Sequence, residues 1–291
     1  MKPTGCKLYP VTSVRRICSS NSLLRQLQEV EIAPRFCDHI PWIHDQPLFP
    51  SCCGESMMAM FEVALPSHPR LSGVRAWTDA RRREGCLSKL EEGTYPHLVV
   101  ESAQWMGPCP YVHGEETSRE MATHIELPHE GVQAFDLRQK NVSQTHITVN
   151  PSDIDVHEII RRAMMLGWQF QLCTGTTDLY QRRGPEEAND PAGLDELSGS
   201  YGGHAQRIAG WIDQEGDKFC YLVQNSWGED WGGTYAVLNV DDSRMTWLPG
   251  CCLVEPVVLQ KAWEINGLLI GRINTGLPPL DISSAVPYRR W

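Results

Sequence analysis

The sequence predicts an α+β fold in which helices come first and antiparallel strands follow. In the first half of the chain, apolar residues recur at helical spacing, most clearly over residues 52–65. In the second half, short apolar or alternating segments such as 168–173 and 218–225 are typical of strands. Helices and strands that are segregated along the chain favour α+β over alternating β/α units. The 291 residues, 41% hydrophobic and 21% charged, suffice for one large domain or two lobes.

The clearest helix is predicted to begin after Ser51, a good N-cap residue. Its apolar residues repeat at helical spacing and a proline ends it: Met57, Met58, Phe61, Leu65 and Pro66. Cys52 therefore falls in the first turn, beside the positive end of the helix dipole. That position lowers the pKa of a thiol and favours the nucleophilic thiolate. The alternative for Cys52 and Cys53 is that both are small core residues.

The remaining elements follow from the same patterns. Helices are also predicted at 21–30, 74–81, 97–105 and 156–166. Strands are predicted at 145–149, 168–173, 204–212, 218–225 and 234–240, with Gly216-Asp217 as a hairpin turn between two of them. The acidic, Pro/Gly-rich segment 181–197 is expected to be a mobile, solvated loop that could border the site.

The charge and the hydropathy pattern exclude several classes of protein. The net charge is −10, from 26 Lys and Arg against 36 Asp and Glu, which disfavours nucleic-acid binding. Two short basic clusters are expected to be solvated surface: Arg81, Arg82 and Arg83, and Arg182 with Arg183. No run reaches about 18 apolar residues, so no membrane span is predicted. The N-terminus lacks the apolar core of a secretory signal.

The cysteines and histidines give no metal-binding pattern. Eleven cysteines occur without a C-x-x-C motif, so the usual ligand spacing of a structural zinc site is absent and no such site is predicted. Most cysteines are interpreted as reduced thiols in a reducing compartment, either the cytoplasm or an assembled virion. Several histidines lack metal-ligand spacing and are expected to be exposed: His39, His44, His113, His124 and His129. No metal and no cofactor is predicted.

The most informative stretch lies near the last third of the chain. His204 follows Gly202 and Gly203, and Asn225 comes 21 residues later in a Trp- and Gly-rich run. A neutral histidine oriented by an asparagine is half of a Cys-His-Asn nucleophilic site. Cys52, 152 residues before His204, is the candidate thiol.

These blocks resemble the papain-like (C1-type) cysteine peptidases. The resemblance rests on Asp45-Gln46 with Ser51-Cys52, on Gly202-Gly203-His204-Ala205, and on Asn225-Ser226-Trp227-Gly228 with Trp231-Gly232. It implies that Cys52 is the nucleophile, His204 the general base and acid, and Asn225 the residue that orients the imidazole. It further implies that Gln46 donates to the oxyanion, and that Trp227 shields the His–Asn bond.

The resemblance also implies an architecture and leaves one register open. It predicts a papain-like domain at 36–255, with a helical lobe at about 46–145, a β-rich lobe at about 146–255 and the active site between them. Residues 1–35 and 256–291 are then N- and C-terminal extensions that could contact assembly partners. In a competing register Cys53-Gly54-Glu55-Ser56 carries the family motif, and Ser56 stands in the nucleophile's place.

The chain also departs from the family pattern. Phe49 stands where the family has a disulfide-forming cysteine, Cys53 where an aromatic residue is usual, and Glu92-Gly93 is a weak match to the glycines that line the substrate cleft. No inhibitory pro-domain is expected. The predicted function is a thiol endopeptidase acting on peptide or protein substrates. The alternative is an inactive papain-like module with a structural or peptide-binding role, for example in a phage virion.

Overall fold

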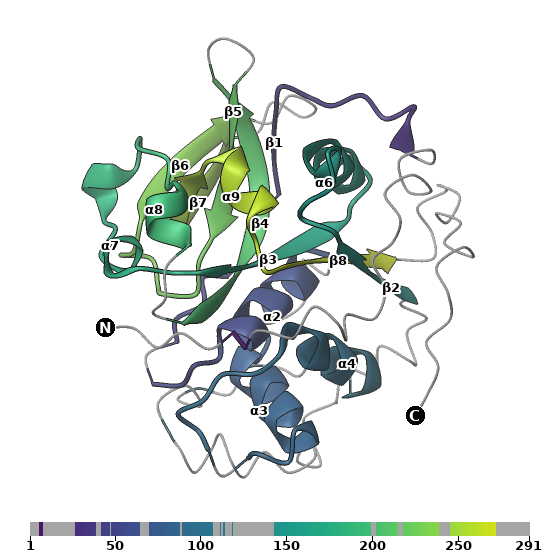
Figure 1. The fold of residues 1–291 in the computed structure, drawn as a ribbon, viewed down its shortest axis with the longest axis vertical. Coiled ribbons are helices and arrows are strands. Elements are labelled where there is room, and N and C mark those ends of the chain that lie inside the picture. The colour runs from purple at the N-terminus through teal and green to yellow at the C-terminus, as the bar shows by residue number, and fades with distance from the viewer. Residues whose placement is uncertain are drawn as a thin grey trace.

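The structure is a computed structural model in which helices and an antiparallel sheet form separate regions (Figure 1). The predicted α+β class is therefore confirmed. The model describes the following residues: 6–7, 27–38, 42–46, 48–64, 70–87, 89–106, 111, 113, 118, 143–198, 202–214, 218–238 and 245–271.

Three helices form the first region: α2 (Cys52–Ala64), α3 (Gly73–Arg83) and α4 (Pro96–Met106). They match the helices predicted there from apolar spacing. Helices α2 and α3 cross closely, because a Cβ on Gly54 would stand 2.0 Å from the carbonyl oxygen of Gly73. The N-terminus of α3 is capped by Ser72, whose hydroxyl accepts from the N–H of Arg75 at 3.0 Å. In Figure 1, α2 lies between α3 and the sheet.

The second region is an eight-stranded antiparallel sheet with strand order β2-β8-β3-β4-β5-β7-β6, in which β1 also pairs with β4. The strands are β1 (Arg35–Cys37), β2 (Ser143–Val149), β3 (Gln169–Gly175), β4 (Gly203–Asp213), β5 (Phe219–Gln224), β6 (Gly233–Leu238), β7 (Met245–Val254) and β8 (Glu264–Gly271). Every strand predicted from the sequence is present within one to three residues of its expected start.

Short helices surround the sheet. They are α6 (Val156–Met165), α7 (Asp178–Gln181), the 3-10 helix η2 (Pro185–Glu187), α8 (Leu194–Leu197) and α9 (Pro256–Gln260). Helix α6 confirms the prediction at 156–166, and its apolar side chains Ile159, Ile160 and Ala163 pack into the sheet core. The helix expected at 21–30 lies outside the described residues up to position 26, and so does the predicted Gly216-Asp217 turn.

The chain beyond residue 255 is not a separate extension as far as Gly271. Strand β8 lies inside the sheet, between β2 and β3, and pairs antiparallel with both. The expected boundary at residue 256 is therefore wrong for residues 256–271. The strand contains Gly267, whose missing side chain leaves room for Ile147 and Phe170, so its apolar pattern is weak in the sequence. Residues 272–291 lie outside the described chain.

Two expectations about charged segments are also wrong. Segment 181–197 is held by buried Arg183, which donates to both carboxylate oxygens of Glu196 at 2.6 Å and to the carbonyl of Asp190 at 2.7 Å. The segment contains η2 and α8, so it is folded structure and not the loop that was expected. Arg81 and Arg183 are 0% and 4% exposed in their side chains, so neither basic cluster is wholly solvated surface. Internal carboxylates and carbonyls satisfy these guanidinium groups.

No helix in the described part of the chain is long and apolar enough to cross a membrane.

Candidate active site

The centre of the site is a buried histidine held by an asparagine across two strands. His204 stands at the start of β4, and Asn225 directly follows β5. The Nε2 atom of His204 lies 2.7 Å from Oδ1 of Asn225, and both residues are buried. Asn225 is fixed in turn, because its N–H donates to the carbonyl of Gly250 at 3.0 Å. Since Nε2 is occupied, Nδ1 is the ring nitrogen left for a thiol.

The candidate thiol, Cys52, is the first residue of α2. Burial alone would raise the pKa of Cys52, but hydrogen bonds from Cys53 and His204 and the charge of the imidazole hold this pKa well below its ordinary value of 9.0. A helix N-terminus acts in the same direction. Ser51 directly precedes the helix. Its carbonyl accepts from the N–H of Glu55 at 3.0 Å, and its hydroxyl donates to the Glu55 carboxylate at 3.0 Å.

Ser56, the alternative nucleophile position, lies one turn further along α2. Its hydroxyl donates to the carbonyl of Cys52 at 2.7 Å and accepts from Nε2 of Gln171 at 2.7 Å. Both contacts are internal to the core beneath the helix. Ser56 is thus engaged by Gln171 and by the helix backbone, whereas Cys52 is the residue whose pKa His204 helps to lower.

Gln46 is held beside this pair by the segment that carries Asn225. The backbone N–H of Gln46 donates to the carbonyl of Ser226 at 2.9 Å, and the Ser226 hydroxyl donates to Oε1 of Gln46. The Nε2 group is the donor end of the side-chain amide, and it is the part that could donate to a bound oxygen. The first backbone N–H groups of α2, beginning at Cys52, are also donors, and they point out of the N-terminal end of the helix.

Aromatic rings cover the histidine. The ring of Trp227 stacks on His204 with centroids 4.3 Å apart and planes 22° apart. Trp231 meets Trp227 edge-on at 5.4 Å, and Tyr180 packs against both indoles. Trp227 and Trp231 are buried at 1% and 5% exposure. Water is thereby excluded from the His204–Asn225 hydrogen bond, which strengthens it.

Glycines and a short N-terminal segment complete the site. Gly202 has a φ of +130°, a backbone conformation that favours glycine. The Cα atom of Gly203 packs directly against the backbone of Cys6. Gly93 is buried and accepts from Arg81 at 3.0 Å; the next residue, Thr94, pairs with Cys6. We call residues 6 and 7 the strap. It lies against Gly203 on one side and Thr94 on the other, and Cys6 belongs to the same buried cluster as Cys52.

Two groups at the site were missed by the sequence interpretation. His44 was expected to be exposed, yet it is 1% exposed, with Nδ1 2.7 Å from Glu55 and Nε2 2.9 Å from Glu62. The seven-residue spacing of these two glutamates on one helix was an available signal, since it puts both on one face. His113, by contrast, is exposed as predicted. Nothing in the sequence indicated that Cys6 reaches the site.

The nine cysteines that the structure describes are all reduced. Within the same residues, no group of three His, Cys, Asp or Glu side chains is arranged to hold a metal ion.

Comparison with solved structures identifies the fold. Xylellain, a cysteine protease from Xylella fastidiosa, superposes with a TM-score of 0.59 at 14% identity, over 94% of this chain and 96% of that one. Procathepsin B S9 from Trypanosoma congolense gives 0.55 at 15% identity, over 93% and 87% of the two chains. Recombinant stem bromelain precursor gives 0.53 at 14% identity, over 92% and 77%. No family model and no curated protein sequence matches the chain.

The chain thus has the papain-like fold of cysteine proteases, as the sequence motifs predicted.

Proposed function

We propose that the protein is a thiol hydrolase that cleaves peptide bonds with Cys52, His204, Asn225 and Gln46. The observation that carries the proposal is the buried His204–Asn225 pair at 2.7 Å under the stacked Trp227 ring. The imidazole of His204 also helps to hold the pKa of the Cys52 thiol well below its ordinary value. A fold shared with cysteine proteases supports it.

The chemistry follows from these groups. The Cys52 thiolate attacks the carbonyl carbon of the peptide, and the carbonyl oxygen gains negative charge. Nε2 of Gln46 and the N–H of Cys52 donate to this oxygen. The His204 imidazolium gives its proton to the leaving amine, and the C–N bond breaks to leave a thioester on Cys52. His204 then takes a proton from water, which attacks the thioester and releases the carboxylic acid and the Cys52 thiolate.

The second candidate is a papain-like module that binds peptide or assembles with other proteins, as in a virion, without catalysis. It is favoured by the coverage of the site: Cys52 and His204 are both 0% exposed beneath the strap. A peptide can reach Cys52 only if the strap leaves. A non-catalytic module would never require that movement, whereas an enzyme must allow it.

Cleavage of a peptide library under reducing conditions distinguishes the two candidates. We expect the wild-type protein to cleave, Cys52→Ala to be inactive, and the matched control Cys220→Ala to retain activity, because Cys220 lies away from the site in another part of the core. Absence of cleavage by the wild type, or equal cleavage by Cys52→Ala, would refute the peptidase proposal.

Alkylation of the protein gives an independent measurement. At about pH 5.5, iodoacetamide should modify Cys52 ahead of thiols whose pKa is raised by burial, such as Cys251, since only a thiolate reacts. His204→Ala should abolish this selectivity. Equal labelling of Cys52 and Cys251, or unchanged selectivity in His204→Ala, would contradict the assignment of the thiolate–imidazole pair.

A further inference from the structure

The strap crosses the candidate nucleophile as an extra extended segment. The N–H of Cys6 donates to the carbonyl of Gly203 at 2.7 Å, and the N–H of Lys7 donates to the carbonyl of Thr94 at 3.0 Å. Cys6 pairs antiparallel with Gly203 and parallel with Thr94. It therefore joins the β-rich region to the helical region beside the buried cluster that contains Cys52.

The side chain of Cys6 enters a cluster of thiols. Cys6, Cys52, Cys53 and Cys173 belong to one buried core cluster, and Cys6 is 7% exposed. Cys173 and Cys53 are the neighbours that lower the pKa of the Cys6 thiol most. Cys53 also donates to the carbonyl of Thr94 at 3.5 Å, the same oxygen that accepts from the strap. Cys173 is paired with Ala205, next to His204, in the register of β3 and β4. Three thiols that the peptidase mechanism does not use thus converge beside the nucleophile.

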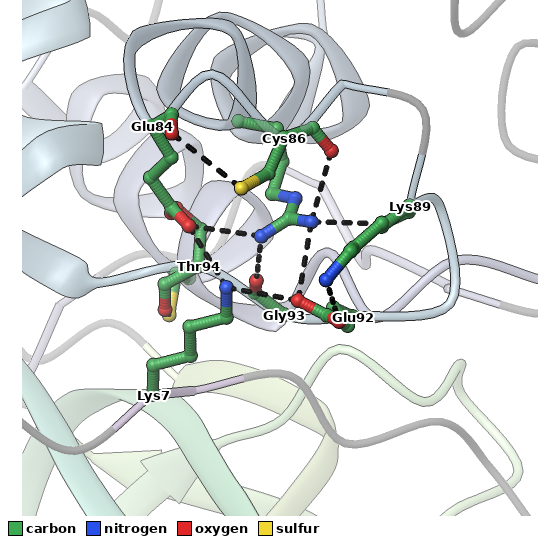
Figure 2. A network of polar contacts seen from close by, with 9 residues as sticks. Lys7, Glu84, Cys86, Lys89, Glu92, Gly93 and Thr94 are labelled. Carbon is green, nitrogen blue, oxygen red and sulfur yellow. Dashed lines mark hydrogen bonds and ion pairs between the residues drawn. The ribbon is translucent and has the colours of Figure 1, made fainter.

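Lys7 anchors the other half of the strap on the helical region. Its Nζ atom lies 2.8 Å from Glu84 and 3.2 Å from Glu92, and 5.6 Å from the centre of the Tyr95 ring. Figure 2 shows the lysine reaching into a ring of carboxylate and carbonyl oxygens at Glu84, Glu92 and Gly93. Arg81, 0% exposed, binds the same two carboxylates. This ionic contact is only partly shielded from water, because the Lys7 side chain is 25% exposed.

We propose that Cys6 is a redox tether: oxidation by a hydroperoxide joins it to Cys53 or Cys173 in a disulfide that locks the strap over Cys52, and a dithiol reductant releases it. In the first step the Cys6 sulfur attacks the peroxide, an S–O bond forms, the O–O bond breaks, and an alcohol or water leaves. In the second step the partner sulfur attacks the Cys6 sulfenic acid, the S–S bond forms, the S–O bond breaks, and water leaves. The two thiols lose two electrons and two protons in total, and the hydroperoxide gains them.

The cluster favours this chemistry at Cys6. Hydrogen bonds from Cys173 and Cys53 outweigh burial and lower the pKa of the Cys6 thiol to about 6, whereas burial and the contact with Cys52 raise the pKa of Cys53. Of Cys6 and Cys53, the more acidic thiol, Cys6, is the one that a peroxide oxidises first. Cys53 and Cys173 lie in the same buried cluster as Cys6 and are the two candidate partners for the disulfide.

The link itself does not depend on catalysis; only its consequence, loss of peptidase activity, rests on the proposed function. The direct test is peptide mapping of the full chain after treatment with hydrogen peroxide, without reduction. We expect a Cys6–Cys53 or Cys6–Cys173 cross-link, its disappearance with dithiothreitol, and the same cross-link in Cys52→Ala. Absence of any disulfide containing Cys6, or its loss in Cys52→Ala, would overturn the proposal.

A second measurement tests the lock. Because a disulfide restrains opening, alkylation of Cys52 by iodoacetamide should be roughly tenfold or more slower in the oxidised than in the reduced protein. In Cys6→Ser the rate should not respond to oxidation in this way, and the matched control Cys220→Ser should behave like the wild type. A response that persists in Cys6→Ser would overturn the tether. If Cys6→Ser does not fold, as judged by circular dichroism, the mapping of the wild type and of Cys52→Ala still decides the question.

Discussion

Replacement of His44 tests whether a buried cation clamps the Gln46 segment to the nucleophile helix. His44 lies two residues before Gln46 and is 1% exposed, and its ring nitrogens contact Glu55 at 2.7 Å and Glu62 at 2.9 Å. Removing the cation leaves two buried carboxylates uncompensated, which costs about 3–5 kcal/mol in comparable buried groups. We expect His44→Leu to lower the free energy of unfolding by about this amount.

The same clamp makes stability depend on pH. Burial would lower the pKa of His44, but Glu62 and Glu55 raise it to about 10, above its ordinary value of 6.5. The folded state therefore holds a proton that the unfolded state has lost between these two values. The stabilisation is complete below about pH 6.5 and disappears as the pH rises through about 10, with a slope of at most about 1.4 kcal/mol per pH unit.

Urea unfolding followed by tryptophan fluorescence measures both effects. The wild type should lose stability between about pH 7 and pH 10, and His44→Leu should lose less over that range. As a matched control, His44→Leu combined with Glu55→Gln and Glu62→Gln should recover part of the lost stability, since no buried charge remains. A His44→Leu protein within about 1 kcal/mol of the wild type, with an unchanged pH slope, would refute the clamp.

Two further predictions concern the oxyanion donor and the strap. Gln46→Ala should lower kcat in the peptide assay by about 10²–10³-fold while the alkylation rate of Cys52 stays unchanged. The control Gln214→Ala, at an exposed position, should change neither quantity. A lowered alkylation rate in Gln46→Ala would mean that Gln46 only supports the fold. Lys7→Ala should raise the alkylation rate of Cys52 a few-fold by weakening the strap, while Lys89→Ala, which contacts Glu92 but not the strap, should not. Equal rates in the two lysine variants would contradict the anchoring contact.

The parts that the sequence predicted are those in which local pattern and chemistry coincide. Helix α2 follows from apolar spacing alone, and its first residue, Cys52, from the change of pattern after Pro50. His204 was identifiable because two glycines precede it, and Asn225 because Ser-Trp-Gly follows it. Both patterns are unusual in ordinary strands. The sequence favoured Cys52 over Ser56 because Gln46 lies six residues before Cys52 and ten before Ser56. Which face of α2 meets β4 could not be read from the sequence.

The parts that the sequence did not predict depend on contacts between distant segments. Strand β8 has weak alternation, and its place between β2 and β3 is set by partners about 100 residues earlier in the chain. The burial of His44 is favourable only because Glu55 and Glu62 face it from another segment. Charged residues such as Arg183 are normally at the surface, and only a partner like Glu196 makes burial possible.

Gly203 connects the sequence motif to the control of the site. A Cβ at this position would stand 2.0 Å from the carbonyl oxygen of Cys6 and 2.4 Å from the Trp263 ring, so only glycine lets another backbone lie directly against β4 beside His204. The carbonyl of Gly203 accepts from the N–H of Cys6 there, as it could from any extended peptide. The strap and a peptide substrate would therefore compete for the same backbone acceptor. A contact that stabilises the bound strap, such as the Lys7 ion pairs or a Cys6 disulfide, would lower the fraction of time in which Cys52 is accessible.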